Sequence, residues 1–127
     1  MANLLVDTDV LIDISKGIST AAEFLDNLKG AVYISIVSAM ELIAGARDKR
    51  EQRIIEEFIN GYQIKELSKP IGNKAYEYLK QYSRSHGLVA MDAIVAATAV
   101  VNDLNLVSKN EKHFGPLKNL KYLKAKY

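Results

Sequence analysis

The sequence alternates short apolar runs with longer helical patterns, and this alternation limits the possible folds more than any other feature. The first run, residues 3–7, contains Leu4-Leu5-Val6 without polar interruption, as expected for a strand covered on both faces. Further strand candidates are residues 31–35, which are β-branched and aromatic, the short segment 62–67, residues 104–108, and 120–125 as a fifth. Strands that alternate with helices form parallel sheets with helices on both faces. We therefore predict an α/β fold: a single domain, residues 1–127, around a central parallel sheet of four to five strands.

Three segments between these runs have the periodicity of helices. Two carry one apolar stripe among charged residues, which predicts surface helices: Ile54, Ile55, Phe58 and Ile59 within 49–60, and Ala75, Leu79 and Tyr82 within 70–85. The third, 91–103, is apolar nearly all round, so we expect it to be the buried helix.

Composition narrows the function classes. The chain has no cysteine, which excludes thiolate catalysis, Cys-ligated zinc and disulfides, so any metal must be held by oxygen atoms or by the two histidines. The longest apolar run, 93–101, is about half of a bilayer span, and no signal-peptide pattern precedes the first strand. We expect a soluble, cytoplasmic protein that makes no membrane contact.

The net charge of +2 is unevenly distributed. Residues 109–127 carry six lysines against one acid, Glu111, whereas residues 1–108 carry 11 basic and 14 acidic side chains. A basic end on a mildly acidic body suits a polyanionic partner, but lysines that only solubilise an exposed segment explain it equally well.

Polar residues follow several of the predicted strands or begin the helices after them. Asp7 ends the first strand, Glu41 lies in the apolar stretch after the second, Asp92 begins the buried helix, and Asn110 follows Ser108 at the end of the fourth strand. Ligand sites in open α/β sheets lie at the carboxyl ends of the strands, where the strand order reverses. One edge of the sheet is therefore expected to gather these groups.

Each of these residues also has an ordinary structural explanation. Asp9, and less readily Asp7, suits the N-cap of the helix that follows. Glu41 stands three residues after Ser38, the spacing of a capping box, and Asp92 suits a helix start through the macrodipole. Asn110 alone suits a turn. Neither His86 nor His113 has a second potential ligand at a spacing typical of a metal-binding or catalytic motif, which favours structural roles for both.

The structural explanations leave the coincidence of four such groups at strand ends unexplained. Mg²⁺ is held by one or two carboxylates together with water and substrate phosphates, and three acids and an amide around a cleft match that requirement. Without a cation the carboxylates would repel, and at least one would take up a proton.

Four ordered segments resemble those of the PIN-domain ribonucleases, especially the small VapC-type toxins of prokaryotic toxin–antitoxin pairs. They are "LLVDTDVLI", "SAMELIAGA", "MDAIVAATA" and "LVSKNEKHF", and the resemblance spans essentially the whole chain. By this resemblance Asp7, Glu41 and Asp92 match the three acids of the family. Asn110 falls where many PIN domains have a fourth acid. Thr8 is expected to be the hydroxyl that supports Asp7, and Ser108 matches the Thr or Ser that precedes the fourth acid.

The resemblance implies an endoribonuclease that depends on Mg²⁺ or Mn²⁺. Asp7 and Asp92 would bind the metal, Glu41 would join through water or a second ion, and Asn110 would orient a water or ligand. Water would attack an RNA phosphodiester, assisted by the metal. The family also implies a homodimer that is silenced by a cognate antitoxin, a second protein whose peptide enters the acidic groove.

The same residues also suggest other function classes. Phosphatases of the haloacid-dehalogenase type also end their first strand with Asp-x-Asp, but they require a late lysine followed by a paired acidic motif. Lys109 suits the first requirement, whereas Glu111 is the one acid beyond it, so the set is incomplete. A PIN nuclease of RNA processing that is not a toxin, and a PIN-like module that binds without cutting, remain alternatives.

Overall fold

The computed structural model describes residues 3–127, so residues 1 and 2 of the predicted domain lie outside the described part. Twelve elements follow one another as β1 (Leu4–Val6), α1 (Thr8–Ser15), α2 (Ser19–Asn27), β2 (Val32–Ser35), α3 (Ile36–Ala44), α4 (Lys49–Asn60), β3 (Gln63–Lys65), α5 (Lys69–His86), α6 (Ala90–Val101), β4 (Asn105–Ser108), α7 (Glu111–Phe114) and β5 (Tyr122–Lys124). The predicted α/β fold is confirmed.

The five strands form one sheet in the order β3-β2-β1-β4-β5, and every neighbouring pair is parallel. Each predicted strand is present, although β1, β3 and β5 are shorter than the apolar runs that predicted them. The strand order reverses between β1 and β4, because the chain leaves β1 toward β2 on one side and returns later to β4 on the other. The carboxyl ends of β1 and β4 therefore frame the position where ligands are expected.

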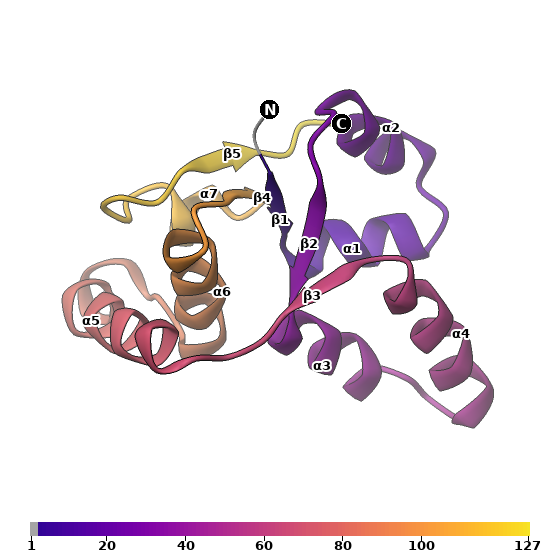
Figure 1. Cartoon of the computed structure of the whole chain (residues 1–127), viewed down its shortest axis with the longest axis horizontal. Helices are drawn as coiled ribbons and strands as arrows, with labels where there is room; N and C mark the ends of the chain where they lie inside the picture. The colour runs from indigo at the N-terminus through magenta and orange to yellow at the C-terminus, as the bar shows by residue number, and fades with distance from the viewer. Residues whose placement is uncertain (1–2) are drawn as a thin grey trace.

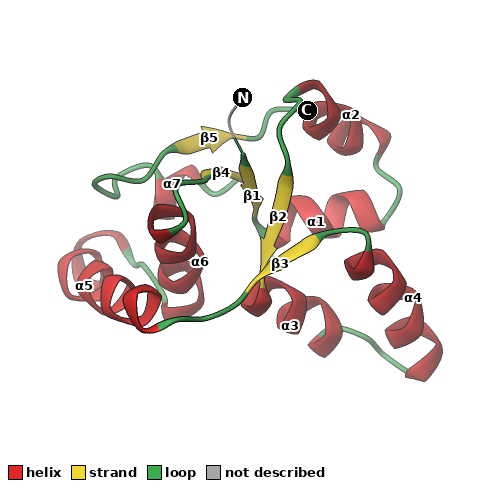
Figure 2. Ribbon diagram, viewed as in Figure 1, coloured by secondary structure: helices red, strands yellow, loops and turns green. Residues whose placement is uncertain are grey.

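Helices cover both faces of the sheet. In Figure 1, α5 and α6 lie on one side of the strands and α1, α2 and α4 on the other, and Figure 2 shows the same layers by secondary structure. Side chains alternate across the sheet: Leu5 joins the core beneath α5 and α6, while its neighbours Leu4 and Val6 join the opposite core. This double cover explains why the first strand is apolar without interruption.

The three helices predicted from periodicity are α4, α5 and α6. The buried residues of α6 are Ala93, Val95, Ala96, Ala97, Thr98 and Ala99, which agrees with its predicted burial. In α4, Ile59 is buried but Ile54 is 57% exposed, so one member of the predicted stripe faces solvent. No helix was predicted at α2, in which only Ala21 and Leu25 are buried.

Three lysines of the basic segment are paired with acids. Lys109 contacts Asp13, Lys121 contacts Asp103 and Lys124 contacts Glu111. Because Glu111 belongs to the segment itself, only Asp13 and Asp103 offset its excess, which is two of the five net positive charges of residues 109–127. No helix within residues 3–127 combines the length and apolar character needed to span a membrane.

Candidate functional site

Asp7 and Ser108 meet where the strand order reverses. Asp7 follows β1 and Ser108 ends β4, and the Ser108 hydroxyl donates a hydrogen bond of 2.8 Å to Asp7 Oδ2. The backbone N–H of Asp7 continues the pairing of the two strands by donating to the Val107 carbonyl at 2.9 Å. The family resemblance assigned the Thr8 hydroxyl to Asp7, but in the structure Ser108 supplies the hydroxyl that contacts Asp7, and the Thr8 hydroxyl contacts Glu41 and Ser38 instead.

The carboxylate of Asp7 is buried, with 7% of the residue exposed. It occupies the N-cap of α1 and accepts a hydrogen bond of 2.8 Å from the backbone N–H of Thr8. Burial is the largest cause that raises the pKa of Asp7 to about 7, and the charges of Asp9 and Asp92 raise it further, against the hydrogen bonds from Ser108 and Thr8. The raised pKa agrees with the expectation that one acid of the cluster takes up a proton in the absence of a cation, although burial contributes more to it than repulsion between the acids.

Asp9 is not the N-cap of α1, contrary to the sequence analysis. Asp7 holds that position because its backbone is still extended, and Asp9 lies in the first helical turn. Its Oδ2 accepts from the Ser108 hydroxyl at 3.3 Å and from the backbone N–H of Lys109 at 3.0 Å. Asp9 therefore ties α1 to the end of β4, beside Asp7. Partial burial raises its pKa, and the Lys109 N–H opposes the change.

Glu41 approaches the site from α3 through a hydroxyl of α1. Thr8 Oγ1 donates to Glu41 Oε1 at 2.8 Å and lies 3.0 Å from the buried Ser38 Oγ. The capping-box explanation of Ser38 and Glu41 is wrong, because α3 begins earlier and Ser35 is its N-cap, accepting from Val37 N–H. Glu41 is exposed to solvent and lies in the second half of α3, away from its N-terminus.

Asp92 and Asn110 converge on a histidine. Asp92 lies in the first turn of α6, and its Oδ2 is 2.6 Å from His113 Nδ1. Asn110 is the N-cap of α7: its Oδ1 accepts from the His113 backbone N–H at 3.3 Å, and its Nδ2 is 3.1 Å from His113 Nδ1. Asn110 is therefore a helix N-cap and not the turn residue that its sequence alone suggested, and it also touches the histidine that contacts Asp92.

All the predicted site residues belong to one connected network. Its central link is the Asn110 backbone N–H, which donates to the Ser108 hydroxyl at 3.0 Å. In order of contact the network contains Glu41, Thr8, Asp7, Ser108, Asn110, His113 and Asp92. Sequence reasoning missed the contacts of Asp9, Ser38 and His113. The only available signals were that Asp9 stands two residues after Asp7 and His113 three residues after Asn110.

The donor set fits a hard divalent cation held mainly by water. Within residues 3–127, no three or more side chains of His, Cys, Asp or Glu are grouped closely enough to form a protein cage for a metal. Asp92 is near enough to Asp7 for its charge to raise the pKa of Asp7. Two carboxylates completed by water and substrate phosphate are the usual way in which Mg²⁺ is bound. The buried charge of Asp7 would also be stabilised by a cation.

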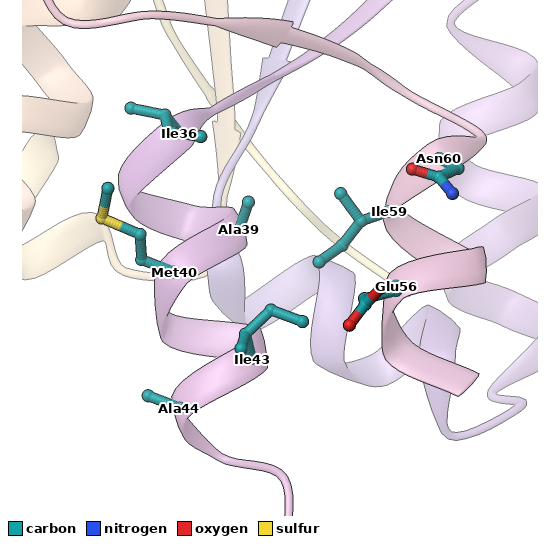
Figure 3. Close-up of a pocket in the computed structure, with 8 residues that line it drawn as sticks. All are labelled: Ile36, Ala39, Met40, Ile43, Ala44, Glu56, Ile59 and Asn60. Atoms are coloured by element: carbon teal, nitrogen blue, oxygen red, sulfur yellow. The ribbon is translucent and has the colours of Figure 1, made fainter. Parts of the chain in front are cut away.

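Two apolar grooves lie beside this network, and only one of them reaches it. A groove of about 500 Å³ between α1, α3 and α4 has Glu41 in its lining together with Ile12, Leu42, Ile54 and Phe58. A second groove, of about 390 Å³, lies between α3 and α4 (Figure 3), where apolar side chains such as Met40 and Ile43 share the wall with Glu56 and Asn60. None of the predicted site residues lines the second groove.

Comparison with known proteins gives consistent results. The family model described as "PIN domain" matches residues 4–116. The chain is 35% identical over 121 residues to Ribonuclease VapC10 of Mycobacterium tuberculosis, covering 93% of this chain and 90% of that protein. It is 33% identical over 122 residues to Ribonuclease VapC1 of Methanocaldococcus jannaschii, covering 92% and 82%.

A solved structure agrees with these sequence relatives. A chain of a toxin–antitoxin complex from Klebsiella pneumoniae superposes with a TM-score of 0.80 and 25% identity, covering 93% of this chain and 95% of that one. The matched region contains β1 to β4, and therefore every residue of the network described above. The chain belongs to the PIN-domain family.

Proposed function

We propose that this chain is an endoribonuclease of the VapC type and the toxin of a toxin–antitoxin pair. The observation that carries the proposal is the network at the β1–β4 switch point, which joins Asp7, Asp92 and Glu41 through hydroxyl, amide and imidazole groups. The likeness over nine-tenths of the chain to proteins named as VapC ribonucleases supports the reaction class.

In the proposed mechanism Asp7 and Asp92 hold Mg²⁺ or Mn²⁺, and Glu41 contributes through water. The bound cation would lower the pKa of a water molecule and neutralise charge that develops on the phosphoryl oxygens. Ser108 fixes one oxygen of Asp7 from the neighbouring strand, and Thr8 fixes Glu41. Asn110 is the N-cap of α7 beside Asp92 and His113, where it would orient a water or an RNA phosphate.

The proposal includes protein partners. The likeness of this chain to a chain of the toxin–antitoxin complex from Klebsiella pneumoniae supports a cognate antitoxin as its partner. The groove that contains Glu41 suits an apolar peptide segment, because Ile54 is exposed on its wall and most of its lining is apolar. A homodimer and a cytoplasmic location also belong to the proposal, since both follow from the resemblance to VapC-type toxins.

Two alternatives make different predictions. A PIN nuclease of RNA processing would cleave RNA but would not arrest growth, and its gene would not lie next to one for a small DNA-binding antitoxin. A PIN-like module that binds without cutting would show neither cleavage nor stabilisation by Mg²⁺ or Mn²⁺, because a ligand raises stability only if it binds the native state.

The decisive experiment compares the wild-type protein with Asp7→Asn and Asp92→Asn variants. We expect RNA cleavage that requires Mn²⁺ or Mg²⁺ and stops with chelator, growth arrest on induction, and loss of both in each variant. Asp26→Asn is the matched control, because this acid is exposed on α2 and outside the network. Full toxicity of a folded Asp7→Asn protein would rule out the metal-nuclease assignment.

A further inference from the structure

His113 is placed to control the orientation of Asp92. Its Nδ1 lies 2.6 Å from Asp92 Oδ2, and both side chains are 22% exposed, so the contact is shielded from most of the solvent. The two residues come from different elements, α7 and α6. Such a contact between elements holds a side chain in one position more firmly than a contact within a helix.

The chemistry of the contact fixes its proton. An ionised carboxylate only accepts hydrogen bonds, so the proton of this short contact lies on Nδ1 of His113. Nδ1 then cannot also accept a hydrogen bond from Asn110 Nδ2, which lies 3.1 Å away. Asn110 still determines where the ring lies, because its Oδ1 accepts from the His113 backbone N–H.

The opposite edge of the imidazole ring faces the end of α5. A Cβ atom placed on Gly87 would lie 4.0 Å from His113 Nε2, which is ordinary van der Waals contact. Gly87 has a φ of +69° and terminates α5, so the ring lies against the turn that leads into α6 and Asp92. The ring is thus bounded by Asn110 on α7, by Gly87 and by Asp92.

We propose that His113 is a positioning residue for Asp92, a role that rests on the proposed function of the site. The terminal torsion of an aspartate is broad, so an unrestrained Asp92 would sample many orientations. The Nδ1–H bond holds Oδ2 and leaves Oδ1 available for the cation shared with Asp7. Partners that orient a metal ligand typically change metal affinity or activity by about 10–100-fold when they are removed.

Two substitutions of His113 separate positioning from packing. His113→Leu keeps an apolar side chain but removes the donor, whereas His113→Asn keeps an N–H near the Nδ1 position. We expect His113→Leu to weaken Mn²⁺ binding, measured by calorimetry, by about 10–100-fold and to lower kcat with a smaller change in KM for RNA. His113→Asn should recover most of both. If His113 acted only by packing, His113→Leu, which keeps an apolar side chain, should be less defective than His113→Asn.

His86 provides the matched control. Its Nδ1 contacts the Ser85 hydroxyl at 2.7 Å and its ring packs against Tyr82, with no contact to Asp92. His86→Leu and His86→Asn should therefore leave Mn²⁺ affinity unchanged. The inference is overturned if His113→Leu binds Mn²⁺ as the wild-type protein does, or if His113→Asn is as defective as His113→Leu.

Nitrogen NMR of the histidine side chains tests the same inference without activity. We expect His113 to carry its proton on Nδ1, and the Nε2–H tautomer would overturn the inference whatever the enzyme does. A wild-type protein that neither binds Mn²⁺ nor cleaves RNA would overturn the proposed function, and with it the metal role of His113. A wild-type protein that does both beside an unaffected His113→Leu variant would overturn only the inference.

Discussion

Asp7 and Glu41 lie on either side of Thr8 but in different surroundings. Asp7 is enclosed between β1 and β4, with 7% of the residue exposed, and its pKa is raised to about 7. Glu41 is exposed on α3, where the Thr8 hydroxyl is its hydrogen-bond donor. A buried carboxylate needs a compensating charge, whereas a solvated one does not. The difference supports the proposal that the closed side of the network would chiefly bind the cation and that Glu41 on the open side would have an auxiliary role.

The largest effect is expected for Asp7→Asn. Loss of the buried ligand should reduce metal-dependent RNA cleavage by about a thousandfold or more, since a metal supplies several kcal/mol of transition-state stabilisation. The fold should be retained, because an asparagine can accept from Thr8 N–H with Oδ1 and donate to the Ser108 hydroxyl with Nδ2. Ser108 then still donates to Asp9. Single-turnover cleavage assays measure the loss, and circular dichroism checks the fold.

The pH dependence of stability provides the second test of the closed side. In the presence of a chelator, the folded protein holds a proton on Asp7 up to about pH 7, because the pKa of Asp7 is raised to about 7. The unfolded chain releases this proton near the ordinary aspartate pKa of 3.8. The folded state therefore binds more protons between these values, and the free energy of unfolding falls as pH rises from about 4 to 7. We expect the contribution of Asp7 to be on the order of 2–4 kcal/mol.

Urea unfolding at several pH values checks this prediction. Asp7→Asn should flatten the curve and be more stable than the wild-type protein near pH 8, because it carries no charge at the buried position. An equal loss of stability with pH in both proteins would place the responsible group elsewhere.

An intermediate effect is expected on the open side. Glu41→Gln keeps an oxygen that can accept from Thr8 but removes the charge, so we expect about a 10–100-fold loss of cleavage. Its stability should match the wild-type protein in chelator, because the side chain is exposed. Cleavage rates and urea midpoints measured together would show this pattern. A stabilisation as large as that of Asp7→Asn would contradict the division between the two sides.

The closed side was also the easier one to predict from sequence. Asp7 is visible because it ends an apolar strand, and Ser108 because it ends another, and parallel strands bring such ends to one edge. The exposed Glu41, in contrast, is marked in the sequence only as an acid within the apolar stretch after the second strand, and its role as the second acid comes from the family resemblance. Its contact with Thr8 depends on how α1 and α3 pack against each other, and no short-range pattern encodes that.

Two errors have a common physical origin. The choice of Asp9 over Asp7 as N-cap and the capping box assigned to Ser38 each required the helix start to within two or three residues. Local preferences do not set a start so closely, since Asp7 and Ser35 cap their helices where the strands before them end. The contact of His113 with Asp92 spans 21 residues and two elements, so it requires the three-dimensional structure.

The smallest effect is expected for Asn110→Ala, which tests whether the amide belongs to the chemistry or only to the turn. Losing the N-cap of a helix costs about 0.5–2 kcal/mol, and α7 has only four residues, so His113 should shift slightly. The backbone N–H of Asn110 still donates to Ser108, which leaves the Asp7 side intact. We therefore expect cleavage to fall by about threefold to tenfold, between the effects of a cap and of a lost ligand partner.

Asn110→Asp separates the two roles, because aspartate is an equally good cap but adds a fourth acid. Wild-type cleavage by both variants would show that position 110 is only a turn, whereas an altered Mn²⁺ requirement in Asn110→Asp alone would place it within reach of the cation.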